Sequence, residues 1–119
     1  MNYVDIAGVA ELQNGQMKPF QAGDHKVLVA RINDKYYAVD RRCPHLGGDL
    51  ATGALDGTVI TCPLHHSQFD VTDGHVIRWT DWTGIKLNLV KIIRSPRALK
   101  TYYVKIENDR LMVEADRSL

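Results

Sequence analysis

Cysteine is scarce in this chain, with two in 119 residues, so a disulfide scaffold is excluded and a single bridge is the most that could form. The first residues lack the basic start and apolar core of a signal peptide. No apolar run is long enough to cross a bilayer, so we expect no transmembrane segment and a cytoplasmic protein. No glycine-rich phosphate loop precedes a helix, which argues against a nucleotide site.

The overall composition is ordinary for a soluble globular protein, with 45% apolar and 24% charged residues. The length fits one domain, which we expect to span 1–119. The net charge of +1 conceals an uneven distribution, because residues 78–105 hold seven lysines and arginines against Asp81 alone. These basic residues belong to no recognition fold for nucleic acid, so we expect no nucleic-acid partner.

Short β-rich runs separated by turn residues predict an all-β fold, a small sandwich or barrel of antiparallel strands. The clearest hairpin joins 26–32 to 35–39, because a two-residue Asn-Asp link between β-rich runs favours a tight turn. The run 16–20 is predicted to be an edge strand, since Pro19 cannot donate a hydrogen bond to a neighbour. Further strands are predicted at 3–7, 53–55, 58–61, 68–71, 75–77, 100–106 and 110–113, followed by a frayed tail over 114–119.

One segment departs from the β pattern. Between 84 and 94 the apolar residues Ile85, Leu89, Ile92 and Ile93 follow helical spacing, with polar residues on the other side. Pro96 would end such a helix near Ser95. We therefore predict a short amphipathic helix over 84–94.

Both cysteines lie in proline-containing runs that also carry histidine, Cys43-Pro44-His45-Leu46-Gly47-Gly48 and Cys62-Pro63-Leu64-His65-His66-Ser67. Any one of these side chains could be a buried small residue or an ordinary loop histidine. Cys43, His45, Cys62 and His65 together, as C-x-H and C-x-x-H with sixteen residues between, indicate a metal site. His66 adjoins a predicted ligand and is interpreted as a non-ligating loop residue, while His25 and His75 are expected to be surface histidines at strand starts.

The residues leave two kinds of metal centre open. Two thiolates and two imidazoles could hold one zinc ion tetrahedrally, although zinc fingers usually pair Cys with Cys and His with His. Here each loop offers one of each. If the Cys and the His of one loop reach different iron atoms, the two loops clasp a two-iron cluster between them.

The segment 43–69 resembles the cluster-binding motif of Rieske iron–sulfur proteins, and most closely that of the small soluble Rieske-type ferredoxins. The resemblance implies a Rieske-like β fold with two cluster-binding loops and one [2Fe–2S] cluster. It also implies that Cys43 and Cys62 hold the buried iron, and that His45 and His65 hold the outer one. Leu46, Gly48, Leu64, Ser67 and Phe69 are then expected to surround the ligands.

Four of these neighbouring positions bear on the reduction potential. Rieske proteins of cytochrome bc-type complexes carry a disulfide between the loops, where this chain has Gly48 and Leu64. They also carry a Ser and a Tyr that donate hydrogen bonds near the cluster; Ser67 matches the Ser, whereas Phe69 lacks the hydroxyl. Losing a donor destabilises the more negative reduced state. We therefore expect a potential in the lower part of the Rieske window of about −150 to +300 mV.

A cluster whose coordination is saturated offers no open site for substrate, so we expect a one-electron carrier rather than an enzyme on its own. The chain also lacks the two-His, one-carboxylate iron motif and the length of a complete Rieske oxygenase. The leading hypothesis is a soluble ferredoxin that passes electrons from a reductase to an oxygenase or other redox enzyme. The alternatives are a small electron-transfer subunit of a larger oxidoreductase complex, and a zinc or cluster regulatory module.

The basic segment 79–97 has three interpretations. Its apolar face could cover one end of the β core, which is the usual role of an amphipathic helix. It could instead be a docking surface for a redox partner, or a peripheral contact with an anionic membrane.

Overall fold

The computed structural model describes residues 3–44, 47–64, 66–78 and 98–114, and within them the chain is all-β, as predicted. Eleven strands and two short 3-10 helices follow one another in these described ranges. Their bounds are β1 Tyr3–Gly8, η1 Val9–Glu11, β2 Gln16–Ala22, β3 His25–Ile32, β4 Lys35–Asp40, η2 Leu50–Thr52, β5 Ala54–Asp56, β6 Val59–Thr61, β7 Gln68–Asp70, β8 Val76–Arg78, β9 Thr101–Tyr102, β10 Val104–Glu107 and β11 Arg110–Glu114.

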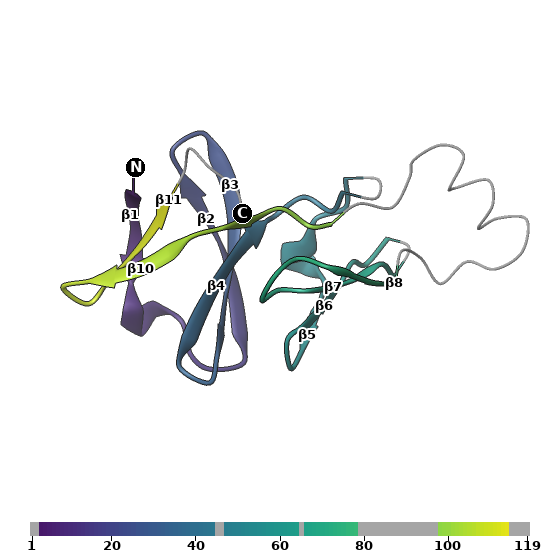
Figure 1. Ribbon diagram of the computed structural model, residues 1–119, viewed down its shortest axis with the longest axis horizontal. Helices are drawn as coiled ribbons and strands as arrows, with labels where there is room; N and C mark the ends of the chain where they lie inside the picture. The colour runs from purple at the N-terminus through teal and green to yellow at the C-terminus, as the bar shows by residue number, and fades with distance from the viewer. Residues whose placement is uncertain (1–2, 45–46, 65, 79–97, 115–119) are drawn as a thin grey trace, which may run out of the picture.

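The strands form three antiparallel sheets with the orders β1-β11-β10, β2-β3-β4-β9 and β5-β6-β7-β8. The sheets follow one another along the molecule, with β1, β10 and β11 at one end and β5–β8 toward the other (Figure 1). β2 lies at the edge of the middle sheet, as Pro19 predicts. Among the described residues, no helix has the length and apolar character needed to cross a membrane.

The middle sheet is buried on both faces, and this explains the uninterrupted apolar run in β3. Successive side chains of a strand point to opposite faces of its sheet. Leu28 and Ala30 accordingly belong to one apolar core, shared with the β5–β8 sheet. Val27 and Val29 belong to a second core, shared with the β1-β11-β10 sheet. Both cysteines lie in the first core, so the fold places them between the middle sheet and the small sheet.

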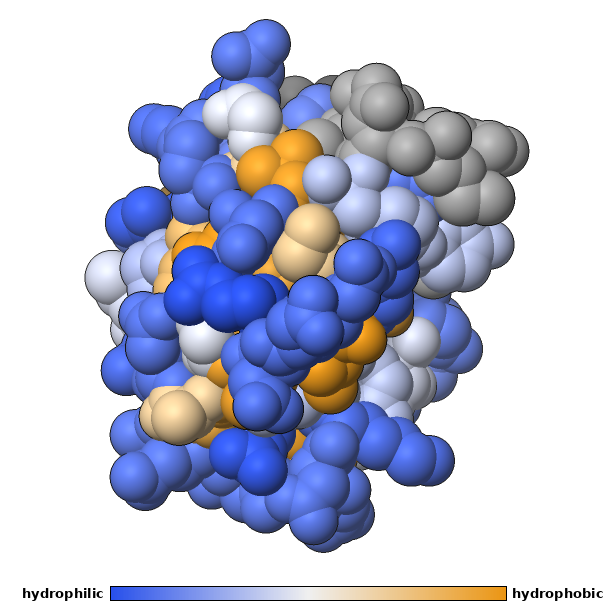
Figure 2. All heavy atoms as spheres, turned by 90° about the vertical axis from the view of Figure 1, so that its left-hand side faces the viewer, coloured by the Kyte–Doolittle hydropathy of each residue, from blue (hydrophilic) through white to orange (hydrophobic). Residues whose placement is uncertain are grey.

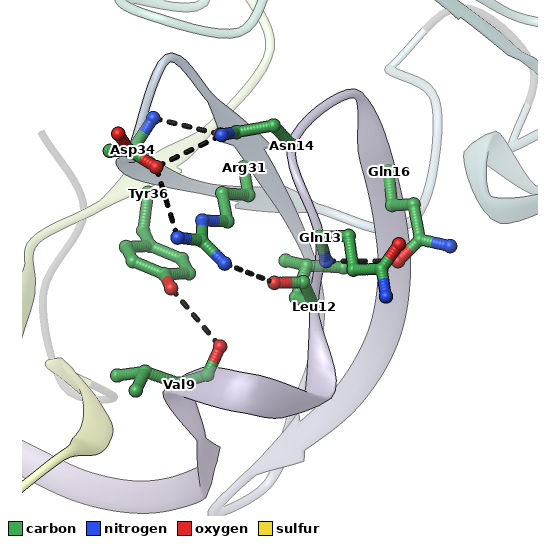
Figure 3. Close-up of polar contacts among 8 residues, drawn as sticks. All are labelled: Val9, Leu12, Gln13, Asn14, Gln16, Arg31, Asp34 and Tyr36. Atoms are coloured by element: carbon green, nitrogen blue, oxygen red, sulfur yellow. Dashed lines mark hydrogen bonds and ion pairs between the residues drawn. The ribbon is translucent and has the colours of Figure 1, made fainter.

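The turn between β3 and β4 is the one predicted from Asn33-Asp34. Both residues have positive φ, 51° and 65°, as a type I′ turn requires. Arg31 connects this turn to the chain before β2, donating through Nη1 to the Leu12 carbonyl at 2.8 Å and through Nη2 to Asp34 Oδ1 at 3.0 Å. The Asn14 side chain donates through Nδ2 to Asp34 Oδ1 and accepts through its Oδ1 from the Asp34 amide (Figure 3). The hairpin and the 9–16 segment therefore form one hydrogen-bonded unit.

Two sequence predictions need correction near the C-terminal end. The run 100–106 is not one strand, because the chain leaves the middle sheet after β9 and joins the end sheet as β10, with Tyr103 between them. Glu114 is not part of a frayed tail, since it is the last residue of β11, pairs with Tyr3 of β1 and is fully buried. The helix predicted over 84–94 lies outside the described residues.

The surface of the β1, β10 and β11 end is mostly hydrophilic, with hydrophobic residues showing in areas between hydrophilic ones (Figure 2). This distribution is ordinary for a folded protein, because scattered apolar side chains on a surface are common.

Candidate cluster-binding site

The two predicted ligand runs form two loops of the same construction. The first, loop 1, spans 43–48 and begins directly after an antiparallel bridge between Arg42 and Asp49. The second, loop 2, spans 62–67 and begins directly after the pair formed by Thr61 in β6 and Gln68 in β7. In each case the cysteine is the first residue beyond the paired stem, and the loop returns to the opposite side of that stem six residues later.

The hydrogen bonds inside the loops repeat as well. In loop 1 the Cys43 amide donates to the Gly48 carbonyl at 2.8 Å, and the Gly47 amide donates to the Cys43 carbonyl at 3.0 Å. In loop 2 the Cys62 amide donates to the Ser67 carbonyl at 2.8 Å, and the His66 amide donates to the Cys62 carbonyl at 3.1 Å. The described parts of the two loops therefore share the same pair of backbone hydrogen bonds, although the loop sequences share only the Cys-Pro start.

The left-handed residue of each loop occupies the same place. Gly47 has φ +77°, which glycine adopts at little cost. His66 stands at the matching position of loop 2 with φ +60°, a conformation that side chains other than glycine rarely take. His66 therefore helps to set the backbone course of loop 2, and its interpretation as a non-ligand stays a prediction.

Both cysteine side chains are buried, with 2% of their surface exposed, and no disulfide joins them. Gly48 of loop 1 lies directly against Cys62 of loop 2, because a Cβ built on Gly48 would be 2.6 Å from the Cys62 sulfur. It would also be 3.1 Å from Cδ1 of Leu64. The two loops thus meet at Gly48, where any side chain would fill the space beside a predicted ligand atom.

The stem of loop 1 is held by a bidentate ion pair. Arg41 donates through Nε and Nη2 to the two carboxylate oxygens of Asp49, both at 2.9 Å. Asp49 also caps helix η2, accepting from the Ala51 amide at 3.0 Å. The hydrogen bond from Arg41, and to a lesser degree the one from Ala51, lowers the pKa of Asp49 below its ordinary value.

A cleft of about 440 Å³ opens beside loop 1, lined by Asp24, His25, Lys26, Asp40, Arg41, Arg42, Gly47, Gly48 and Asp49. Burial raises the pKa of Asp40, with Lys100 and His25 opposing the shift. Burial, and then the Asp40 charge, raise the pKa of Tyr102 to about 12. The cleft holds charges of both signs, so it favours neither a simple anion nor a simple cation.

The predicted neighbours of the ligands divide into buried and exposed groups. Ser67 and Phe69 have no exposed surface, and Phe69 belongs to the core that contains the cysteines. Leu64 is 55% exposed, although its side chain lies close to Gly48. His45, Leu46 and His65 lie outside the described residues, so their assignments stay predictions.

Three side chains around the loops were not anticipated from the sequence. Arg41 and Asp49 pair across eight residues, and Arg78 donates through Nε and Nη2 to the His66 carbonyl at 3.1 and 3.0 Å. No local pattern identifies these contacts, since each depends on which strands become neighbours. An acidic residue closing a loop before a short helix, as Asp49 does, is the one feature that capping rules could have indicated.

Residues 2–94 match the family model of the Rieske [2Fe-2S] domain, and this range contains both loops. The chain belongs to the Rieske [2Fe-2S] domain family.

This Rieske chain is similar in sequence to two kinds of known protein. It is 31% identical over 117 residues to the 2,4-dinitrotoluene dioxygenase system ferredoxin component of Burkholderia sp. (strain RASC), covering 97% of each chain. It is 30% identical over 112 residues to human apoptosis-inducing factor 3, covering 94% of this chain but 16% of that protein. Among solved structures, the ferredoxin of carbazole 1,9a-dioxygenase from Nocardioides aromaticivorans IC177 has a TM-score of 0.75 at 24% identity. That comparison covers 95% of this chain and 97% of the ferredoxin, and it shows a shared fold.

A Rieske-type [2Fe–2S] cluster is accordingly the cofactor of this family member, and the described residues fit it. Two buried thiols stand at matching positions of matching loops, as a centre clasped from both sides requires. The space beside the Cys62 sulfur, which a Cβ at Gly48 would fill, is kept open by glycine.

Proposed function

We propose that Cys43, His45, Cys62 and His65 hold the [2Fe–2S] cluster and that the chain is a soluble one-electron carrier, a Rieske ferredoxin. The observation that carries the proposal is the pair of matched loops with a buried cysteine at the start of each. In Rieske centres two histidines replace two cysteines on one of the irons. The sequence offers one histidine in each loop at the spacing that this ligand set requires.

The residues around the ligands shape the centre in separate ways. The cluster supplies a place for one electron, taken up and given back without an open coordination site. Cys43 and Cys62 begin hydrogen-bonded loops and are shielded by the core, whose packing limits where their sulfur atoms can lie. Phe69 fills the space behind the cysteines without offering a hydroxyl donor, so we propose a potential in the lower part of the Rieske window.

For the physiological role, we propose electron transfer from a reductase to an oxygenase or another redox enzyme. Support comes from relatives of matching length, such as the dioxygenase-system ferredoxin component of which this chain covers 97%. We propose that the whole chain, 1–119, acts as one domain in the cytoplasm.

The first test is electron paramagnetic resonance of the purified protein after dithionite reduction, with iron, sulfide and zinc analysis. We expect about two irons and two sulfides per chain, and a rhombic signal with an average g value below that of the free electron. Cys43→Ser and His65→Ala should each lose this signal. A colourless protein containing zinc would refute the proposal.

The second test addresses the partner. Reduced protein is mixed in a stopped-flow instrument with the oxidised terminal component of an aromatic-ring dioxygenase system, and the visible absorbance of the cluster is followed. Reoxidation that depends on the concentration of that component supports the ferredoxin role. A cluster that is reduced and oxidised reversibly by an electrode, but by no reductase–oxygenase pair, would contradict it.

A second candidate role is that of an electron-transfer module within a larger oxidoreductase. The match to human apoptosis-inducing factor 3 favours this role, because the equivalent region there is a part of a much longer chain. Stable co-purification of a tagged chain with one redox enzyme, at equal stoichiometry, would support the module over the freely diffusing carrier.

A further inference from the structure

Two arginine side chains lie against the two loops at the same loop position. In loop 2, Arg78 donates through both Nε and Nη2 to the His66 carbonyl. In loop 1, the Arg42 guanidinium lies over Gly47, since a Cβ built on Gly47 would be 2.8 Å from Nε and 3.0 Å from Nη2. Gly47 and His66 are the matched left-handed residues, each the fourth after its cysteine. The repeated backbone of the loops is thus accompanied by a repeated arginine.

Neither of these two arginines is held in an ion pair with a described residue, although the charge of Asp40 interacts with Arg42 at longer range. Arg41, the neighbour of Arg42 in sequence, does pair with a carboxylate, that of Asp49. Within the described part of the chain, Arg42 and Arg78 form no ion pair, and both are exposed. Arginine stays protonated at every pH at which a protein folds. Each arginine therefore places a lasting positive charge beside the left-handed residue of its loop.

Arg78 makes a direct contact with the backbone of loop 2. His66 adopts the left-handed conformation without the freedom of glycine, and such a residue persists only where its surroundings hold it. Arg78 donates through Nε and Nη2 to the carbonyl of His66 itself. Because Arg78 ends β8 and pairs with Gln68 of β7, the contact connects a third strand of the small sheet to loop 2. This contact reaches loop 2 in a chain that has no disulfide between its loops.

We propose that Arg42 and Arg78 are positioning residues of the cluster, which raise its reduction potential by their charge, and that Arg78 also restrains loop 2. The inference rests on the proposed function, because it concerns the cluster that the loops hold. Reduction adds one negative charge to the centre, and a nearby positive charge stabilises the reduced form more than the oxidised one. Since both arginines are exposed, the effect weakens when salt shortens the screening length.

The test of the charge compares three single variants, Arg42→Gln, Arg78→Gln and Arg110→Gln. Arg110 is the matched control, because it is also an exposed arginine but belongs to β11 in the sheet at the far end of the molecule. Potentials are measured by protein-film voltammetry at about 10 mM and about 0.5 M salt. We expect lower potentials for Arg42→Gln and Arg78→Gln than for Arg110→Gln at low salt, with the difference shrinking at high salt. Equal potentials in all three variants would overturn the charge role.

The test of the restraint uses Arg78→Lys, which keeps the charge but cannot donate two hydrogen bonds in the same fork. We expect its potential to stay near that of the unaltered protein, while its cluster is released several-fold faster to a chelator. Release at the unaltered rate would overturn the restraint. If Arg78→Gln does not retain a cluster at all, Arg42→Gln and Arg78→Lys still decide the two roles. Failure of the proposed function would appear differently, as a missing Rieske signal in the unaltered protein itself.

Discussion

Gly48 offers the sharpest test of how the loops meet. Gly48→Ala places a methyl group 2.6 Å from the Cys62 sulfur, whereas ordinary contacts begin near 3.4 Å. The sulfur or the loop must therefore move by about 0.8 Å, and Leu64, at 3.1 Å, restricts movement on that side. Overpacking of this kind costs about 1–3 kcal/mol, or about a 5- to 140-fold change in the ratio of folded to unfolded protein.

The expected outcome is a protein that folds but holds its cluster poorly. The melting temperature of the cluster-free form should fall by about 4 °C for each kcal/mol lost. The iron content after reconstitution should fall more than stability does, because the displaced atom is itself a predicted ligand. Circular dichroism measures the first quantity, and iron analysis with visible absorbance measures the second.

Gly8→Ala is the matched control. Gly8 has φ −80°, so alanine fits its backbone, and a Cβ there would meet its nearest neighbour at an ordinary 3.4 Å. This variant should bind iron like the unaltered protein. The reasoning would be refuted if Gly48→Ala also bound two irons per chain with an unchanged spectrum and potential.

Three further outcomes follow from the same structure. Asp49→Asn should lower the free energy of unfolding by about 1 kcal/mol, because the exposed pair with Arg41 is bidentate but solvent-screened. Folding lowers the pKa of Asp49, so the full loss of unfolding free energy should appear above about pH 5 and should vanish as the pH falls through the folded-state pKa. Urea titrations of both proteins at several pH values measure this loss. A loss that does not change with pH would contradict the prediction. Phe69→Tyr should raise the reduction potential, because the new hydroxyl can donate a hydrogen bond toward the cluster. An unchanged potential in voltammetry would mean that the hydroxyl of this fully buried ring does not reach the cluster. Leu28→Ala should cost about 2–5 kcal/mol in urea unfolding and weaken cluster retention, because Leu28 is fully buried in the core shared with both cysteines; a loss below about 1 kcal/mol would show that this core tolerates a cavity.

Much of the fold could be predicted because it is encoded by neighbours in sequence. Asn33-Asp34 predicted its hairpin correctly, since a type I′ turn depends on the two residues that form it. Pro19 placed β2 at a sheet edge by removing one donor. The ligand spacing indicated the cofactor and the family, because residues only two or three positions apart must share one short loop.

What the sequence alone determined, then, was the pair of candidate ligand loops, the all-β class and most hairpins, each set by short-range spacing and turn chemistry. The tertiary structure decided how these parts meet. Gly48 lies against Cys62, Arg78 binds the His66 carbonyl, and the run 100–106 divides between two sheets. None of these three features could be predicted from a periodic pattern, because each depends on residues that are far apart in the sequence. They depend on the register and packing of whole sheets, which are settled by burying the shared cores rather than by any local pattern.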